Sequence, residues 1–307
     1  MKILLKSILD QTFYCIIYFI RYNFKEGDYL KKKRKLDLKP IEMDTPWARI
    51  VKEKAKSGKH PIKNRKLKKK MYPDGIENQT GSAIPVNLSL GTYEDQIIPR
   101  KVAEYFIQKA GTILLIDCPC RTANKCENHD VHLGCTWMGR GASKMPLDKW
   151  PGAHIATKEE ALERERLAYE NGLVPHLGKL RSDAVIYEVV DYEDEFMSIC
   201  HCCSCCCVAS IMKYGPSFIK QTVKRMEGVE VRVDPDKCVG CGTCFKVCIY
   251  DAMKMKKNKA MIEQEECMGC GRCERVCPNG AISISIDDYS RIDELIARFE
   301  ERVDISN

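Results

Sequence analysis

The stretch CVGCGTCFKVC, residues 238–248, and its near-copy CMGCGRCERVCP, residues 267–278, decide the fold of the last quarter of the chain. Each copy spaces its cysteines as C-x2-C-x2-C-x3-C, and the second copy starts 29 residues after the first. A structural zinc site needs four ligands, which typically come from two C-x2-C pairs at a longer separation. Three cysteines at two consecutive x2 spacings instead favour iron–sulfur ligation.

The residues around these cysteines fit that interpretation. Glycines 240, 242, 269 and 271 stand between the cysteines, where a tight loop needs residues that accept positive φ. Such loops can aim amide N–H groups at sulfur, and those hydrogen bonds help to set a redox potential. The flanking segments VEVRV, AMIE and AISISI alternate apolar and polar residues, which predicts short strands.

With these features, residues 229–286 resemble the bacterial two-cluster ferredoxins. The resemblance implies that three cysteines of each copy bind one [4Fe–4S] cluster and that the fourth binds the other cluster. It assigns the first cluster to Cys238, Cys241, Cys244 and Cys277, and the second to Cys267, Cys270, Cys273 and Cys248. One departure is Ile249, which stands where the family usually has proline and bears on the turn rather than on ligation.

Residues 83–228 predict a mixed domain rich in cysteine. The segment PRKVAEYFIQKAG, residues 99–111, predicts a helix that starts at its proline and ends before its glycine. In TKEEALERERLAYENGL, residues 157–173, Thr157 and Glu160 predict a capping box and Gly172 a helix end. Strands are expected at TILLID, residues 112–117, and at AVIYEVV, residues 184–190, and each is followed along the chain by cysteines.

Ten cysteines in this domain are candidate metal ligands: Cys118, Cys120, Cys126, Cys135, Cys200, Cys202, Cys203, Cys205, Cys206 and Cys207. If the run CHCCSCCC, residues 200–207, opens a helix, cysteines four residues apart lie on common faces. The run could then contribute to two clusters, with the earlier cysteines supplying the other ligands. The sequence leaves four interpretations of these cysteines open: two further iron–sulfur clusters, one further cluster, a zinc site or unliganded thiols. The spacing does not assign individual ligands.

The order of these motifs also resembles that of uncharacterised iron–sulfur proteins of anaerobes, in which a cysteine-rich domain precedes a two-cluster ferredoxin unit. The resemblance implies a redox role without naming a substrate. Three histidines lie among the cysteines, and each either ligates or tunes a metal or simply packs: His129, His132 and His201. Arg121, beside the first cysteine pair, either offsets cluster charge or bridges to a carboxylate.

Residues 1–82 predict an apolar helix followed by a basic arm. Residues 1–71 hold 21 lysines and arginines against 7 acidic residues, whereas residues 72–307 hold 29 against 36. The apolar run Phe13–Ile20 is too short and too interrupted to span a bilayer, and no signal-peptide cleavage site follows it. The helix therefore lies in a membrane interface, docks on a partner subunit or packs on its own domain. The basic arm attracts an anionic surface or is only solvated, and nucleic acid is not expected because no aromatic residues interleave with the charges.

The fold class that follows is α+β, with an N-terminal helix and arm (1–82), a cysteine-rich mixed domain (83–228), a two-cluster ferredoxin-like unit (229–286) and an amphipathic C-terminal helix (287–307). Apolar residues at helical spacing define the last element, whose apolar face is expected to pack on this chain: Ile292, Leu295, Ile296, Phe299 and Val303.

These features predict an iron–sulfur electron-transfer protein that exchanges single electrons with a flavoprotein or metalloenzyme partner. No G-x-G-x-x-G fingerprint follows a predicted strand, so a hydride-accepting cofactor would have to come from that partner. The alternative is a reductase with a catalytic, open-site cluster in the cysteine-rich domain. Nineteen cysteines arranged for metal rather than for disulfides favour a reducing compartment, hence the cytoplasm, with contact to the membrane surface through the N-terminal helix and arm.

Overall fold

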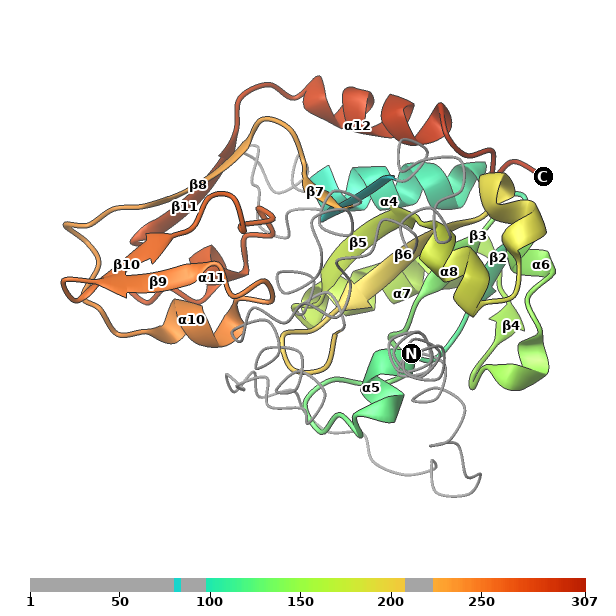
Figure 1. Cartoon of the computed structure of the whole chain (residues 1–307), viewed down its shortest axis with the longest axis horizontal. Helices are drawn as coiled ribbons and strands as arrows, with labels where there is room; N and C mark the ends of the chain where they lie inside the picture. The colour runs from blue at the N-terminus through green and yellow to red at the C-terminus, as the bar shows by residue number, and fades with distance from the viewer. Residues whose placement is uncertain (1–79, 84–97, 208–222) are drawn as a thin grey trace, which may run out of the picture.

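The computed structural model describes residues 80–83, 98–207 and 223–307 and has the expected α+β character. A seven-stranded sheet with helices on both faces forms the larger part, and a smaller unit of short strands and helices stands at its side (Figure 1). The predicted N-terminal helix, the basic arm and Cys15 lie outside the described residues. None of the helices within these ranges has the length and apolar character needed to cross a membrane.

The larger sheet has the strand order β4-β2-β3-β6-β5-β1-β7, and only the β1–β7 pair is parallel. Its first strand begins at Thr80, three residues before the predicted start of the cysteine-rich domain at residue 83. The strands are β1 (Thr80–Ala83), β2 (Ile113–Leu115), β3 (Thr136–Met138), β4 (His154–Ile155), β5 (Val174–Lys179), β6 (Met197–Cys202) and β7 (Lys224–Arg225).

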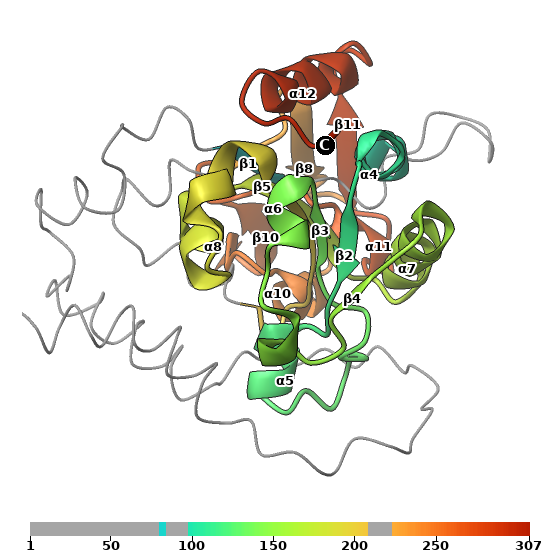
Figure 2. The same cartoon turned by 90° about the vertical axis from the view of Figure 1, so that its right-hand side faces the viewer.

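Helices bury both faces of this sheet (Figure 2). Ile113 and Leu115 face the core under α4 (Ile98–Lys109) and α7 (Lys158–Glu170). Leu114 faces the opposite core, under α6 (Arg140–Ser143) and α8 (Arg181–Ile186). Strand residues alternate between the two faces, and a sheet covered on both faces therefore needs uninterrupted apolar strands such as β2. Three further short helices connect these elements: α5 (Pro119–Ala123), η2 (Leu147–Lys149) and η3 (Val190–Glu195).

The two predicted helices of this domain are confirmed. The Thr157 hydroxyl accepts a hydrogen bond from the Glu160 amide at 3.2 Å, which caps the start of α7. The Glu160 carboxylate lies 2.8 Å from His154 Nε2, so it also ties the helix to β4. Gly172 follows α7 with a φ of 66°, in the left-handed region expected of a helix-ending glycine.

The predicted strand at residues 184–190 is wrong, because its first half belongs to α8. Ala184 and Tyr187 are both buried in one core, where the Tyr187 ring lies 4.2 Å from the Trp137 ring, centroid to centroid. A helix places residues three apart on one face, whereas a strand would send them to opposite faces. The strand that runs into the cysteines is β6, which pairs with β5.

The smaller, C-terminal unit contains the three predicted strands and one further strand, β9 (Met253–Lys256), in two antiparallel pairs. β8 (Val229–Val233) pairs with β11 (Ile282–Ile286), and β9 pairs with β10 (Lys259–Ile262). Each pair contacts one short helix that follows a cysteine loop. α10 (Thr243–Val247) contacts β9, and α11 (Arg272–Arg275) contacts β11.

The last helix, α12 (Arg291–Glu300), lies along α4 on the larger domain (Figure 1). Phe299 is fully buried, and its ring meets that of Phe106 edge-on at a centroid distance of 5.9 Å. The tail continues this contact, since Gly111 N donates to Ile305 O at 2.8 Å and Asp304 N donates to Asp194 O at 2.9 Å. The expected packing of the C-terminal helix on this chain is therefore confirmed.

Replacing Phe299 with alanine tests this docking. The substitution removes a fully buried ring, so we expect the free energy of unfolding to fall by about 3–5 kcal/mol. Urea unfolding followed by circular dichroism measures the change. Tyr289→Ala is the matched control, because its ring is 52% exposed and its loss should change stability by about 0.5 kcal/mol or less. Equal midpoints for Phe299→Ala and wild type would show that α12 does not stabilise the fold.

Candidate metal centres

The cysteine loops of the C-terminal unit have the backbone that their glycines predict. All four glycines between the cysteines have positive φ, from 69° at Gly269 to 77° at Gly271. At Gly240 a Cβ atom would lie 2.3 Å from the Asn258 carbonyl oxygen, and at Gly269 it would lie 2.7 Å from Val229. Both positions therefore need glycine for backbone conformation and for space.

Backbone amides in this unit donate hydrogen bonds to several of the cysteine sulfurs. Such donors stabilise sulfur in its anionic, metal-binding form. The donor–sulfur pairs are Ala260 N to Cys238 Sγ at 3.4 Å, Ala281 N to Cys277 Sγ at 3.2 Å, Ala252 N to Cys248 Sγ at 3.3 Å and Gly269 N to Cys267 Sγ at 3.5 Å. These amides favour the anionic form of the sulfurs, whereas burial of the sulfurs opposes it.

The first predicted cysteine set surrounds one hollow. Cys238, Cys241, Cys244 and Cys277 all line it, so Cys277 of the second copy closes a site built by the first copy. Burial raises the pKa of Cys244 to about 11, with smaller contributions from the other three sulfurs. Cys241 is exposed, and this set therefore lies at the surface of the unit.

The second predicted set lies deeper in the molecule. Burial raises the pKa of Cys270 to about 12, and the nearby sulfurs of Cys248 and Cys267 add to the rise. Burial also raises the pKa of Cys273, with further contributions from Cys270, Cys248 and Cys267. Cys248 of the first copy therefore lies with the second copy, which is the exchange of fourth cysteines that the resemblance implies. A cationic iron core would relieve the repulsion among these sulfurs.

Four cysteines of the larger domain form what we call the compact sulfur group: Cys126, Cys203, Cys205 and Cys206. Their sulfur atoms all lie within 4.8 Å of one another. Cys126 Sγ is 3.6 Å from Cys205 Sγ, which in turn is 3.7 Å from Cys206 Sγ. Cys203 and Cys205 are buried, and the other two are half-buried, so the group is a largely buried candidate for an additional metal site.

The other six cysteines form what we call the extended sulfur group: Cys118, Cys120, Cys135, Cys200, Cys202 and Cys207. Thiol contacts link four of these side chains in a series and join the other two as a separate pair. They join Cys118 to Cys120, Cys120 to Cys207, Cys207 to Cys202 (3.0 Å between sulfurs) and Cys135 to Cys200. The group thus unites cysteines that follow β2 with cysteines that end β6.

The cysteine run 200–207 does not open a helix in the described residues, which corrects the expectation from sequence. Its first three residues complete β6, and Ser204–Cys206 form a turn. The sulfur of Cys202 therefore meets Cys207 rather than Cys206. The run still contributes to two groups, because the turn sends Cys203, Cys205 and Cys206 to one side and returns Cys207 to the other.

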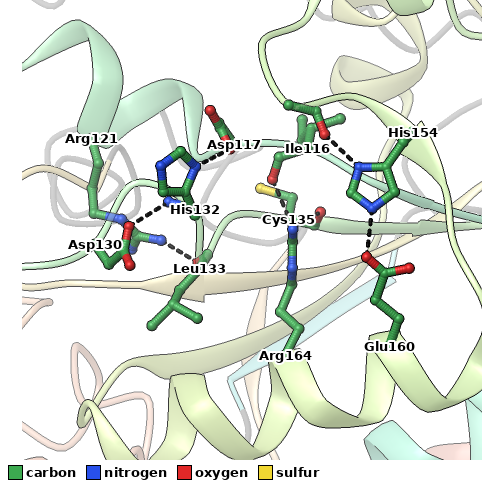
Figure 3. A network of polar contacts seen from close by, with 11 residues as sticks. Ile116, Asp117, Arg121, Asp130, His132, Leu133, Cys135, His154, Glu160 and Arg164 are labelled. Carbon is green, nitrogen blue, oxygen red and sulfur yellow. Dashed lines mark hydrogen bonds and ion pairs between the residues drawn. The ribbon is translucent and has the colours of Figure 1, made fainter. Parts of the chain in front are cut away.

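Arg121 lies between these two sulfur groups and is fully buried. It donates to the carbonyl oxygen of Leu133 (Figure 3) and to that of His201 at 2.8 Å. It forms no ion pair with a carboxylate in the described part of the chain. Burial opposes its charge, but four cysteines outweigh burial and raise its pKa: Cys118, Cys203, Cys135 and Cys126. A buried guanidinium without an anion is costly, so this arginine fits metal-bound thiolates on both sides.

The three histidines differ in what they can bind. Both ring nitrogens of His201 have oxygen partners, Gly134 O at 2.6 Å and Glu165 Oε1 at 2.7 Å, so neither is left for a metal. His132 is exposed and lies 2.9 Å from Asp117 (Figure 3). His129 is buried beside Cys203, burial lowers its pKa to about 4, and its Nδ1 has no hydrogen-bond partner among the residues described.

Residues of α7 hold the sulfur groups in place and were not predicted from the sequence. Arg164 donates to the carbonyl oxygens of Ile116 (2.7 Å) and Cys135 (3.4 Å), which joins the end of β2 to the start of β3 (Figure 3). Glu165 anchors His201 within the cysteine run. Glu165 shares a helix face with the buried residues Ala161 and Ala168, a spacing that could have indicated its burial.

A family model described as a 4Fe-4S dicluster domain matches residues 231–284. The C-terminal unit is a ferredoxin-type dicluster domain. The match includes all eight cysteines of the two predicted sets and ends before α12. No protein with a curated description matches the chain. The dicluster domain therefore supports an iron–sulfur electron-transfer role, and the compact sulfur group supports a further metal site in the larger domain.

The dicluster domain meets the extended sulfur group through Ile249 and Tyr250. Both side chains are buried in one cluster that contains Cys270 of the dicluster domain and Cys202 and Cys207 of the larger domain. Burial raises the pKa of Tyr250, and these three sulfurs raise it further. Ile249, the residue that replaces the family's usual proline, thus contributes an apolar side chain to the junction.

His176 completes this junction from the larger sheet. Its Nε2 atom is hydrogen-bonded to the Tyr250 hydroxyl, and the two rings stack at a centroid distance of 5.6 Å and an interplanar angle of 15°. His176 is opposite Cys200 in the β5–β6 register. A continuous buried contact therefore leads from the second cysteine set of the dicluster domain to the extended sulfur group.

Proposed function

We propose that this protein relays single electrons between an external redox protein and the cysteine-rich domain. The observation that carries the proposal is the buried position of Tyr250 between Cys270 on one side and Cys202 and Cys207 on the other. A [4Fe–4S] cluster bound by each cysteine set would supply one-electron redox chemistry. The residues of the junction exclude water and hold the two domains in fixed contact.

The surface end of this relay is the hollow around the first cysteine set. Three large apolar side chains of the same unit are exposed, Val239 by 60%, Met255 by 44% and Met261 by 43%. Lys256, Lys257 and Lys259 lie beside them on the β9–β10 hairpin, all exposed. An apolar patch with a basic rim fits a partner whose redox centre lies within an acidic surface, such as a flavoprotein electron carrier.

The inner end of the relay is the extended sulfur group. Six sulfurs are two more than a cubane needs, and this surplus favours a second candidate function, a reductase that converts a substrate in the cysteine-rich domain. A change in the electron paramagnetic resonance (EPR) signal of the middle domain on adding substrate would support the reductase. We further propose that the protein works where oxygen is scarce, because the exposed Cys241 leaves its set open to oxidation.

An anaerobic redox titration followed by EPR tests the relay. Iron bound at the extended sulfur group should couple magnetically to the second set of the dicluster domain, because the Tyr250 contact joins them. We therefore expect the dicluster signal to broaden when the iron of the larger domain is also reduced. A dicluster signal that is the same in all reduction states would contradict the relay.

Charge reversal on the hairpin tests the docking surface. In the double variant Lys256→Glu, Lys257→Glu, we expect reduction by an acidic flavodoxin at low salt to slow about tenfold, because steering is electrostatic. The wild-type rate should fall as salt is added, and the variant rate should change little. Stopped-flow absorbance measures both rates. Lys101→Glu, an exposed position on α4, is the control. A wild-type rate that rises with salt would show that the partner surface is not acidic.

A further inference from the structure

The compact sulfur group is more closely spaced than a cubane-binding set of the same chain. Its four sulfurs all lie within 4.8 Å of one another. Across the described residues this is the single group of three or more potential metal ligands with that property. Neither cysteine set of the dicluster domain has it, although those sets belong to a 4Fe-4S family. The dicluster domain thus serves as an internal standard for the spacing of cluster ligands.

The spacing within the compact sulfur group is that of ligands to one ion. A tetrahedral site with metal–sulfur bonds of 2.3 Å separates its sulfurs by about 3.8 Å. In the compact sulfur group, Cys126 Sγ is 3.6 Å and Cys206 Sγ is 3.7 Å from Cys205 Sγ. In a cubane each thiolate binds a different iron atom, which spreads the sulfurs further apart. We propose that Cys126, Cys203, Cys205 and Cys206 bind one tetrahedral thiophilic ion, Zn²⁺ or Fe²⁺, and not an iron–sulfur cluster.

The charges around the group agree with this assignment. Four thiolates around a divalent ion carry a net charge of −2, and the buried guanidinium of Arg121 lies next to Cys203 and Cys126 to offset part of it. None of the acidic residues that the structure describes enters the group. Its four donors are therefore all sulfur, a donor set that zinc and iron share in tetrahedral sites.

The position of the group indicates a structural role. Cys126 follows α5, whereas the other three ligands follow β6, about 80 residues later in the chain. One ion would therefore fasten the α5 loop to the end of β6. The same two segments carry Cys118, Cys120 and Cys202 of the extended sulfur group, so the ion would also position those sulfurs.

Metal and sulfide analysis of Cys205→Ser tests the assignment. We expect this variant to lose one metal ion per chain while its acid-labile sulfide stays at the wild-type level. Mass spectrometry of the metals identifies the ion as zinc or iron. A loss of about four irons together with about four sulfides would overturn the proposal, because that is the signature of a cubane. The control Cys273→Ser should lose sulfide, which separates this result from a failure of the dicluster assignment.

X-ray absorption on the wild-type protein keeps the test decisive if Cys205→Ser does not fold. A [4Fe–4S] cluster contains equal numbers of iron and sulfide. Wild-type protein with intact clusters should therefore contain one more metal ion than sulfide per chain. At the zinc edge, if the ion is zinc, we expect four sulfur neighbours at about 2.3 Å and no second metal nearby. If the ion is iron, replacing it with Co²⁺ should give the ligand-field bands of a tetrahedral thiolate site. Equal amounts of metal and sulfide, with no zinc, would overturn the proposal.

Discussion

The variant Cys273→Ser is expected to lose one of the two clusters of the dicluster domain, which is about four irons and four sulfides per chain. Cys273 lies in α11, and the sulfurs of Cys270, Cys248 and Cys267 surround it. A serine hydroxyl binds iron poorly, because it does not readily give up its proton. The negative charge of three neighbouring sulfurs makes that ionisation still less favourable. Iron and sulfide analysis of anaerobically prepared protein, together with EPR after reduction, measures the loss.

Two controls sharpen this experiment. Cys241→Ser should remove the other cluster, and because Cys241 is exposed, that variant should keep the junction at Tyr250 intact. Cys15→Ser should leave iron and sulfide unchanged, since Cys15 is the one cysteine to which we assign no ligand role. Full iron and sulfide in Cys273→Ser would count against the assignment of the second set.

The variant Arg121→Met is expected to destabilise the larger domain by about 3–5 kcal/mol, because it leaves buried negative charge without a partner. The guanidinium is fully buried, lies between both sulfur groups and donates to two carbonyl oxygens. Its removal should also release metal from the cysteine-rich domain. The dicluster domain should keep its iron, because Arg121 contacts neither of its cysteine sets among the contacts described.

Chemical denaturation and metal analysis measure both effects. Arg121→Lys should give an intermediate loss, because lysine keeps the charge but cannot reach two carbonyl oxygens with a planar fork. Arg166→Met is the matched control on α7, where an exposed arginine pairs with Glu163 and Glu170. Its effect on stability should be small, because solvent screens an exposed ion pair. Wild-type stability and metal content in Arg121→Met would show that the sulfur groups are not anionic.

The dicluster domain could be predicted from the sequence because its ligands are local. Three cysteines of each set lie within seven residues, and the glycines between them determine the loop. The flanking strands alternate over short stretches, so β8, β10 and β11 were also predictable. The fourth cysteine of each set comes from the other copy, and that exchange was implied by the family resemblance rather than by spacing.

The cysteine-rich domain was predictable only in part, because its sites depend on distant contacts. Capping signals predict its two longer helices, but residues 184–190 predict a strand, because their apolar content fits either structure. Cys126 joins Cys203, Cys205 and Cys206 only through the fold, and no local spacing shows it. The Tyr250–His176 contact likewise joins two domains, so neither residue stands out in the sequence.

The pairing of β8 with β11 has a consequence for the architecture. Val229, where the chain enters the dicluster domain, is opposite Ile286, where the chain leaves it. The domain is thus a cassette inserted between β7 and α12, and its two ends are neighbours. A foreign module with adjacent ends could be grafted at the same points without moving α12 from α4. Evolution and protein engineering could therefore exchange the dicluster domain while the cysteine-rich domain keeps its sulfur groups.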